Sequence, residues 1–154
     1  MQIRQATPAD EAVLIDYNRR LAAETEGKTL DLTTIQRGVR AMLTDPHKGL
    51  YFVAENAGAV VGQLGVTQEW SDWRNGWFWW IQSVYVRQDA RRQGIFRALF
   101  QRVVEAARRD PDVIGVRLYV DEHNHTAQKT YQQLGLAKTE YWLLEMFPLS
   151  ETAT

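Results

Sequence analysis

Apolar residues recur along the chain in two spacings, one typical of helices and one typical of strands. Steps of three or four positions predict helices over residues 8–21, 31–43, 95–109 and 126–134. Shorter apolar or alternating runs predict strands at 1–6, 50–55, 59–67, 77–86, 113–120 and 137–147. Gly62 and Gly65 lie inside one of these strands, which indicates a bulge or a close approach by another element.

The order of these elements predicts an α/β (mixed α+β) fold. Strand, two helices, three strands and then alternating helix and strand imply a mixed central sheet of six to seven strands, with helices on both faces. The strand–helix–strand segment 81–120 should form a parallel pair. We find no internal repeat or linker, so residues 1–154 are expected to form a single domain.

Composition removes several classes of protein. The net charge of -1 gives no global positive field that would attract nucleic acid or anionic lipid. The absence of cysteine excludes disulfides and thiol nucleophiles. The first residues lack a signal-peptide pattern, and no apolar run is long enough to span a bilayer, so a cytoplasmic protein without membrane partners is expected.

The most informative local stretch is RRQGI, residues 91–95, which lies between a predicted strand and a predicted helix. The first amides of a helix have no partner within it, and they attract phosphate groups together with the helix dipole. Gly94 lets the backbone approach a ligand closely, and Arg91 and Arg92 add positive charge. An ordinary turn with solvated arginines fits this spacing equally well.

Two motifs resemble the acetyl-CoA signature of the GNAT family of N-acetyltransferases. The first is Arg91-Arg92-Gln93-Gly94-Ile95-Phe96 followed by Arg97, in which Phe96 stands where the family has a small residue. The second has Asn124, Ala127 and Tyr131 at the family spacing, followed by Leu134-Gly135-Leu136. The resemblance is strong from residue 81 to residue 136 and looser before it.

The resemblance implies acetyl-CoA as co-substrate and a sheet whose central strands splay apart. Pantetheine would then pair with the backbone of Val84, Tyr85 and Val86, and one amide there would polarise the thioester carbonyl. Tyr131 would act as general acid toward the leaving thiolate. The residues expected to bind the co-substrate are Val84, Tyr85, Val86, Arg91, Arg92, Gln93, Gly94, Ile95, Phe96, Arg97, Asn124 and Ala127. Taken alone, Tyr131 fits a core position, and Asn124 fits a helix cap.

The acceptor side gives weaker signals. The strand 77–86 holds no acid, so the base candidates are Glu69 and Asp72, while Gln82 is expected to order water or substrate. We expect Trp70 and Trp73 to lie in a loop, where they could contact a cation or an acyl group. Glu24 and Glu26 lie between the first two helices, and the resemblance implies that this connection lines the acceptor site. Two carboxylates there would favour a cationic amine, although a solvated loop explains them as well.

The sequence therefore predicts an acetyl-CoA-dependent N-acetyltransferase that uses direct attack by a primary amine. The acceptor is expected to be a small cationic molecule such as a polyamine or an amino-acid-like amine. Two alternatives remain open: a nucleic-acid-binding module that uses the basic helix 91–109, and a non-catalytic acyl-CoA sensor. We expect no metal, because His123 and His125 have no carboxylate cluster at ligand spacing. A homodimer is left open.

Overall fold

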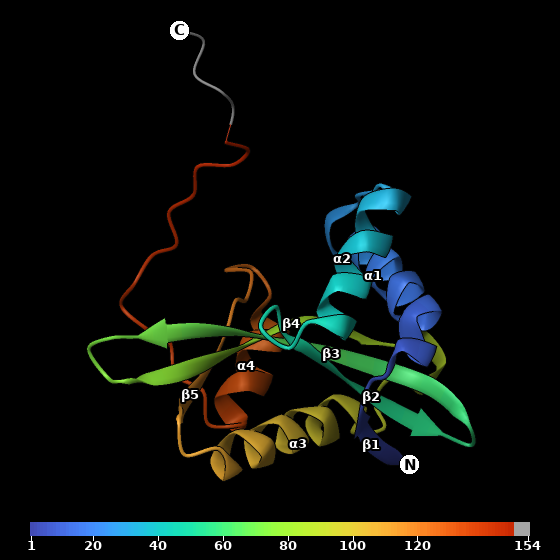
Figure 1. Cartoon of the computed structure of the whole chain (residues 1–154). Helices are drawn as coiled ribbons and strands as arrows, with labels where there is room; N and C mark the ends of the chain where they lie inside the picture. Colours follow the sequence, from blue (N-terminus) through green and yellow to red (C-terminus); the bar gives the residue numbers. More distant parts are fainter. Residues whose placement is uncertain (150–154) are drawn as a thin grey trace, which may run out of the picture. The chain divides into compact units, whose positions relative to one another are not determined.

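The computed structural model describes residues 1–149 of the chain (Figure 1). These residues fall into two compact units, one from Met1 to Asp121 and one that begins at Glu122. Each unit is described by itself below. The expectation of a single domain stays a prediction.

The first unit is built on a five-stranded sheet in the order β1-β2-β3-β4-β5. Its strands are β1 (Gln2–Gln5), β2 (Leu50–Asn56), β3 (Ala59–Ser71), β4 (Gly76–Val86) and β5 (Val113–Leu118). All neighbours pair antiparallel except β4 and β5, which are parallel, as the segment 81–120 predicts. The mixed α/β class is confirmed, but the described residues form five strands instead of six or seven.

Helices cover both faces of this sheet, with α1 and α2 on one side and α3 on the other (Figure 1). The helices are α1 (Glu11–Glu26), α2 (Leu32–Thr44) and α3 (Ile95–Arg109), with short 3-10 turns η1 (Pro8–Asp10) and η2 (Gln88–Ala90). Asp31 caps α2 by accepting a hydrogen bond from the Thr34 amide at 2.9 Å. The boundaries of α3 agree with those predicted from its apolar spacing.

Strand alternation divides the core between the two faces. Tyr51 and Val53 of β2 join Leu14 of α1 and Val39 of α2 in one buried cluster. Phe52 lies between them in sequence, and the Arg102 guanidinium of α3 lies over its ring at 5.8 Å from the centroid. The face that α1 and α2 cover is therefore distinct from the face that α3 covers.

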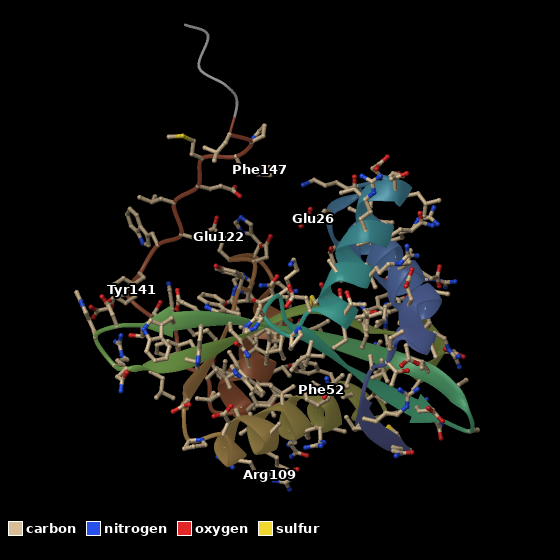
Figure 2. The ribbon with its side chains drawn as sticks, viewed as in Figure 1. Glu26, Phe52, Arg109, Glu122, Tyr141 and Phe147 are labelled. Carbon is tan, nitrogen blue, oxygen red and sulfur yellow. The ribbon has the colours of Figure 1, made fainter. Side chains whose placement is uncertain are left out.

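The second unit contains one helix among its described residues, α4 (His125–Gln133). The strand predicted at 137–147 is wrong, because residues 136–149 form no regular element. Their apolar side chains are exposed, for example Tyr141 at 76% and Phe147 at 82% (Figure 2). An apolar run with strand propensity becomes a strand only where it has a hydrogen-bonded neighbour, and here it has no ladder partner within 1–149.

None of the helices within residues 1–149 has the length and apolar character needed to cross a lipid bilayer. In the same part of the chain, no three side chains of His, Cys, Asp or Glu gather closely enough to hold a metal ion.

Candidate functional site

Strand β4 changes its surroundings halfway along its length. Its pairing with β5 runs from Trp77 to Ile81, opposite Leu118, and stops there, although β4 itself continues to Val86. Within residues 1–149, the stretch from Gln82 to Val86 has a strand partner only on its β3 side. We call residues 82–86 the free half of β4. Its open edge is the parting of strands that the family resemblance implies.

A β-bulge marks the start of the free half. Two residues of β4, Ser83 and Val84, lie opposite the single residue Leu64 of β3. Ser83 has φ +52°, a left-handed conformation that non-glycine residues seldom adopt. The bulge changes the direction of the strand where its pairing with β5 ends.

Gln63 holds this bulge from β3. The side chain is fully buried, and its Nε2 donates a hydrogen bond to the Ser83 carbonyl at 3.0 Å. Its Oε1 is also buried and has no hydrogen-bond partner within the described residues. A buried amide with one unsatisfied atom destabilises the fold. Because Gln63 lies beneath the strained Ser83, we infer that it holds the backbone of the bulge in place. Sequence reasoning did not single out Gln63, because a glutamine in a strand is usually solvent-exposed.

The turn after the free half leads into α3 with two residues in left-handed conformation, Arg92 at φ +63° and Gly94 at φ +76°. The first helical hydrogen bond joins the Ala98 amide to the Gly94 carbonyl at 3.0 Å, so the preceding amides have no acceptor within the helix. A Cβ built on Gly94 would meet nothing within 4 Å, so the space beside this glycine is open. These features fit the diphosphate of acetyl-CoA.

Close packing places α3 against the sheet at the start of the helix. A Cβ added to Gly62 of β3 would lie 3.1 Å from Ile95 Cγ2 and 3.5 Å from Leu99 Cδ1. The close approach that Gly62 predicts is therefore confirmed. Phe96, which departs from the family motif, packs along its own helix with its ring centroid 6.1 Å from that of the buried Phe100.

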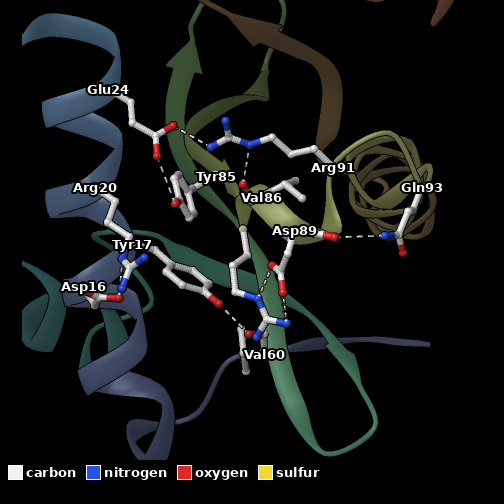
Figure 3. Close-up of polar contacts among 11 residues, drawn as sticks. Asp16, Tyr17, Arg20, Glu24, Val60, Tyr85, Val86, Asp89, Arg91 and Gln93 are labelled. Atoms are coloured by element: carbon white, nitrogen blue, oxygen red, sulfur yellow. Dashed lines mark hydrogen bonds and ion pairs between the residues drawn. The ribbon is translucent and has the colours of Figure 1, made fainter.

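Arg91 is the residue that links the turn to α1 (Figure 3). Its Nη2 donates to Glu24 Oε2 at 2.5 Å, and its Nε donates to the Val86 carbonyl at 2.9 Å. Tyr85 of the free half donates from its hydroxyl to the other Glu24 oxygen at 3.2 Å. Burial, followed by the negative charge of Glu24, raises the pKa of the Tyr85 phenol.

Earlier in α1, Tyr17 and Arg20 lie beside the same group of residues (Figure 3). The Tyr17 ring lies 4.9 Å from the Tyr85 ring, and its hydroxyl donates to the Val60 carbonyl at 2.5 Å. Arg20 pairs with Asp16 at 2.8 Å. Sequence reasoning missed both residues, because helical periodicity assigns Tyr17 to the core and Arg20 to the solvent.

The other residues expected to bind the acceptor have contacts different from those of Glu24. Glu26 pairs with Lys28 at 2.9 Å, in the same stretch of chain. Gln82 donates to the Thr67 hydroxyl at 2.6 Å. The expectation of a loop is right for Trp73, which is 87% exposed in the β3–β4 turn, and wrong for Trp70, which belongs to β3. Trp70 pairs with Trp77 in the β3–β4 ladder, and the two rings meet edge-on with their centroids 4.9 Å apart.

Both base candidates lie toward the far end of the β3–β4 hairpin. Glu69 is opposite Phe78 in the ladder and pairs with Arg117 at 2.7 Å. Asp72 accepts a hydrogen bond from the Trp73 amide at 2.9 Å. Phe78 and Ser83 are five positions apart on β4, so Glu69 lies about 17 Å from the bulge along the strand.

The second motif lies in the second unit. Asn124 caps α4 by accepting a hydrogen bond from the Ala127 amide at 3.1 Å, which confirms its role as a cap. Tyr131 lies in the last turn of α4, and burial raises the pKa of its phenol. The other roles expected of these residues stay predictions.

Comparisons with known proteins agree with both motifs. The family model described as Acetyltransferase (GNAT) family matches residues 14–136. The crystal structure of a possible acetyltransferase from Clostridium difficile 630 is 43% identical, covers 94% of this chain and 95% of that chain, and superposes with a TM-score of 0.89. A search of curated proteins finds no match.

Two more distant structures share the fold. A probable acetyltransferase is 21% identical, with coverage of 99% of this chain and 100% of that chain and a TM-score of 0.84. A predicted acetyltransferase with acetyl-CoA from Clostridium acetobutylicum is 18% identical, with coverage of 94% and 95% and a TM-score of 0.77. The chain therefore belongs to the acetyltransferase (GNAT) family and is an N-acetyltransferase that uses acetyl-CoA.

Proposed function

We propose that this enzyme transfers the acetyl group directly to a primary amine of a small cationic molecule, such as a polyamine or an amino-acid-like amine. The observation that carries this proposal is the Glu24 carboxylate, which a hydrogen bond from Tyr85 holds beside the free half of β4. A carboxylate at that place would attract an ammonium group. Glu26, Trp70, Trp73 and Gln82 are proposed as more distant contacts of the acceptor.

In the proposed reaction, the amine nitrogen bonds to the carbonyl carbon, the carbon–sulfur bond breaks, and the thiolate takes a proton while the amine loses one. The chain has no cysteine that could carry an acyl intermediate, which supports direct attack. An amide of the free half, among Val84, Tyr85 and Val86, would donate a hydrogen bond to the carbonyl oxygen as negative charge develops there.

Tyr131 is proposed as the proton donor on the strength of its spacing from Asn124 in the family motif. Burial raises the pKa of its phenol, so the group stays protonated at neutral pH and has a proton to give. The turn residues Arg91, Arg92, Gln93, Gly94, Ile95, Phe96 and Arg97 are proposed to bind the diphosphate, and Asn124 and Ala127 the pantetheine arm. Glu69 and Asp72 are proposed to accept the proton of the amine through water.

A thermal shift assay followed by thiol release tests the proposal. Acetyl-CoA should raise the melting temperature, duplex DNA should not, and free CoA should appear when an amine is added. Cadaverine and 5-amino-1-pentanol form a matched pair, because they differ in one positive charge; we expect kcat/KM to be about tenfold higher for cadaverine. A salt-sensitive shift with DNA alone would favour nucleic-acid binding, and a shift without turnover would favour a sensor.

A further inference from the structure

Glu24 connects the acceptor side of the proposed site to the turn that would bind the diphosphate. The carboxylate belongs to the last turn of α1, and it contacts both Tyr85 on β4 and Arg91 in the turn before α3 (Figure 3). The Arg91 and Glu24 side chains are 42% and 31% exposed, so solvent and a ligand can reach this ion pair.

The end of α1 is a poor place for an uncompensated carboxylate. Its last turn holds no basic residue, and the negative end of the helix dipole disfavours the acids there. Glu26 is compensated by Lys28 and Glu24 by Arg91, each through an ion pair. If Arg91 turned to another anion, Glu24 would need a new cationic partner.

The charged side chains drawn around Glu24 in Figure 3 form one-to-one ion pairs. Asp16 and Arg20 form one pair, and Glu24 and Arg91 form the second. Arg87, in the same region, is paired with Asp89 at 2.6 Å. Loss of Arg91 from this set would leave one net negative charge at the end of α1.

We propose that Glu24 is a specificity-determining residue whose carboxylate is masked by Arg91 until the diphosphate of the co-substrate draws Arg91 away, and then binds the ammonium group of the acceptor. This inference rests on the proposed function. A guanidinium forms bidentate hydrogen bonds with phosphate, and a diphosphate offers more negative charge than one carboxylate. Tyr85 keeps its hydrogen bond to the other Glu24 oxygen and so holds the carboxylate beside the free half of β4.

A consequence is positive coupling between the two substrates. Diphosphate binding frees the carboxylate for the acceptor, and by linkage the acceptor favours diphosphate binding to the same extent. The co-substrate therefore prepares the acceptor site by changing its charge, without any movement of α1.

The variant Glu24→Gln separates the two roles. Without its competitor, Arg91 is free to meet the diphosphate, so isothermal titration should show CoA and ADP binding about 3- to 10-fold more tightly. Pantetheine, which lacks a diphosphate, should bind as it does to the wild type. With saturating acetyl-CoA, the KM for cadaverine should rise about tenfold while kcat changes less than about threefold, because the carboxylate binds the acceptor and takes no part in proton transfer.

Glu11→Gln is the matched control. Glu11 is also on α1 and pairs with an arginine, Arg40, at 2.7 Å, so the same charge is removed from the same helix at its other end. This variant should leave CoA affinity and the KM for cadaverine unchanged. A variant that only loosened the fold would lower the melting temperature and weaken CoA binding, opposite in direction to the expected result.

The outcomes distinguish the inference from the proposed function. If the wild type releases no thiol with any amine, both fail. If the wild type acetylates cadaverine and Glu24→Gln behaves as Glu11→Gln does, only the role of Glu24 is overturned. If Glu24→Gln does not fold, Glu24→Asp replaces it, because the shorter carboxylate reaches Arg91 less well; unchanged affinities in that variant overturn the inference too.

Discussion

The two halves of β4 belong to one continuous strand and have different surroundings. Residues 77–81 pair with β3 on one edge and β5 on the other, and their side chains form aromatic contacts such as Trp70 with Trp77. Within residues 1–149, residues 82–86 have a strand partner on one edge only, and this half contains the bulge at Ser83. Residues 77–81 are all apolar, whereas residues 82–86 begin with Gln82 and Ser83 and end with the apolar Val84, Tyr85 and Val86. Backbone pairing separates the two halves more sharply, because the pairing with β5 ends at Ile81.

The free half of β4 is where we propose that the co-substrate binds. A strand edge without a partner exposes amides and carbonyls that would otherwise pair within the sheet. The bulge is held by Gln63, and the turn beyond is held by Arg91, so the free half is fixed at both of its ends. We therefore expect variants at the free half to change activity more than variants at the paired half.

The largest effect is expected from the proton donor. Tyr131 is the acid proposed from the family motif, whereas the hydroxyl of Tyr85 in the free half donates a hydrogen bond to Glu24. Tyr131→Phe should lower kcat about 100-fold with little change in the KM for acetyl-CoA. Because burial raises the pKa of Tyr131 from its ordinary value of 10.0, the wild type should lose activity only at alkaline pH, and the variant should lose that limb of its pH profile.

Two variants serve as controls for that result. Tyr141→Phe makes the same change at an exposed position of the second unit and should keep full activity. Tyr85→Phe should keep kcat within about threefold, since it removes a hydrogen bond to Glu24 and no proton donor. If Tyr85→Phe loses kcat as Tyr131→Phe is expected to, the free half supplies its own acid and our assignment is wrong.

The next effect concerns the turn that follows the free half. Gly94→Ala should raise the KM for acetyl-CoA about tenfold or more, because its Cβ enters the space beside the proposed diphosphate site. Gly58→Ala is the matched control: Gly58 has φ +79° and nothing within 4 Å of a built Cβ, as Gly94 does, but it turns the β2–β3 hairpin. Both variants should lose about 1 kcal/mol of unfolding free energy in a denaturant titration. An equal KM for both would argue against diphosphate binding at Gly94.

A smaller effect is expected beneath the bulge. Gln63→Leu removes the donor to the Ser83 carbonyl and should lower the unfolding free energy by about 1–3 kcal/mol, part of which is recovered because the unsatisfied Oε1 is removed as well. If the bulge positions the free half, the KM for acetyl-CoA should rise about threefold to tenfold in steady-state kinetics. Loss of stability with an unchanged KM would restrict Gln63 to the structural part of the sheet.

The sequence predicted features that depend on local patterns. The bounds of α3 follow from its apolar spacing and from Gly94 before it, and the parallel pairing of β4 with β5 follows from handedness rules. Features that depend on distant partners were not predictable. The contact between Glu24 and Arg91 spans 67 positions, and nothing in the sequence distinguishes Glu24 from Glu26. Ser83 has a left-handed backbone although it is not a glycine, and the apolar run at 137–147 has no strand partner within the described part of the chain.

The smallest effect is expected in the paired half of the hairpin. Glu69→Gln with Asp72→Asn should lower activity a few-fold, more at low pH than at high pH, if these acids relay the proton of the amine through water. Loss of the pair between Glu69 and Arg117 should change the unfolding free energy by less than about 1 kcal/mol, because both groups are partly solvated. The pH–rate profile is the deciding measurement, and an unchanged profile would exclude both acids from the reaction. The end of the β3–β4 hairpin that holds them would then have a structural role only, in contrast to the free half of β4.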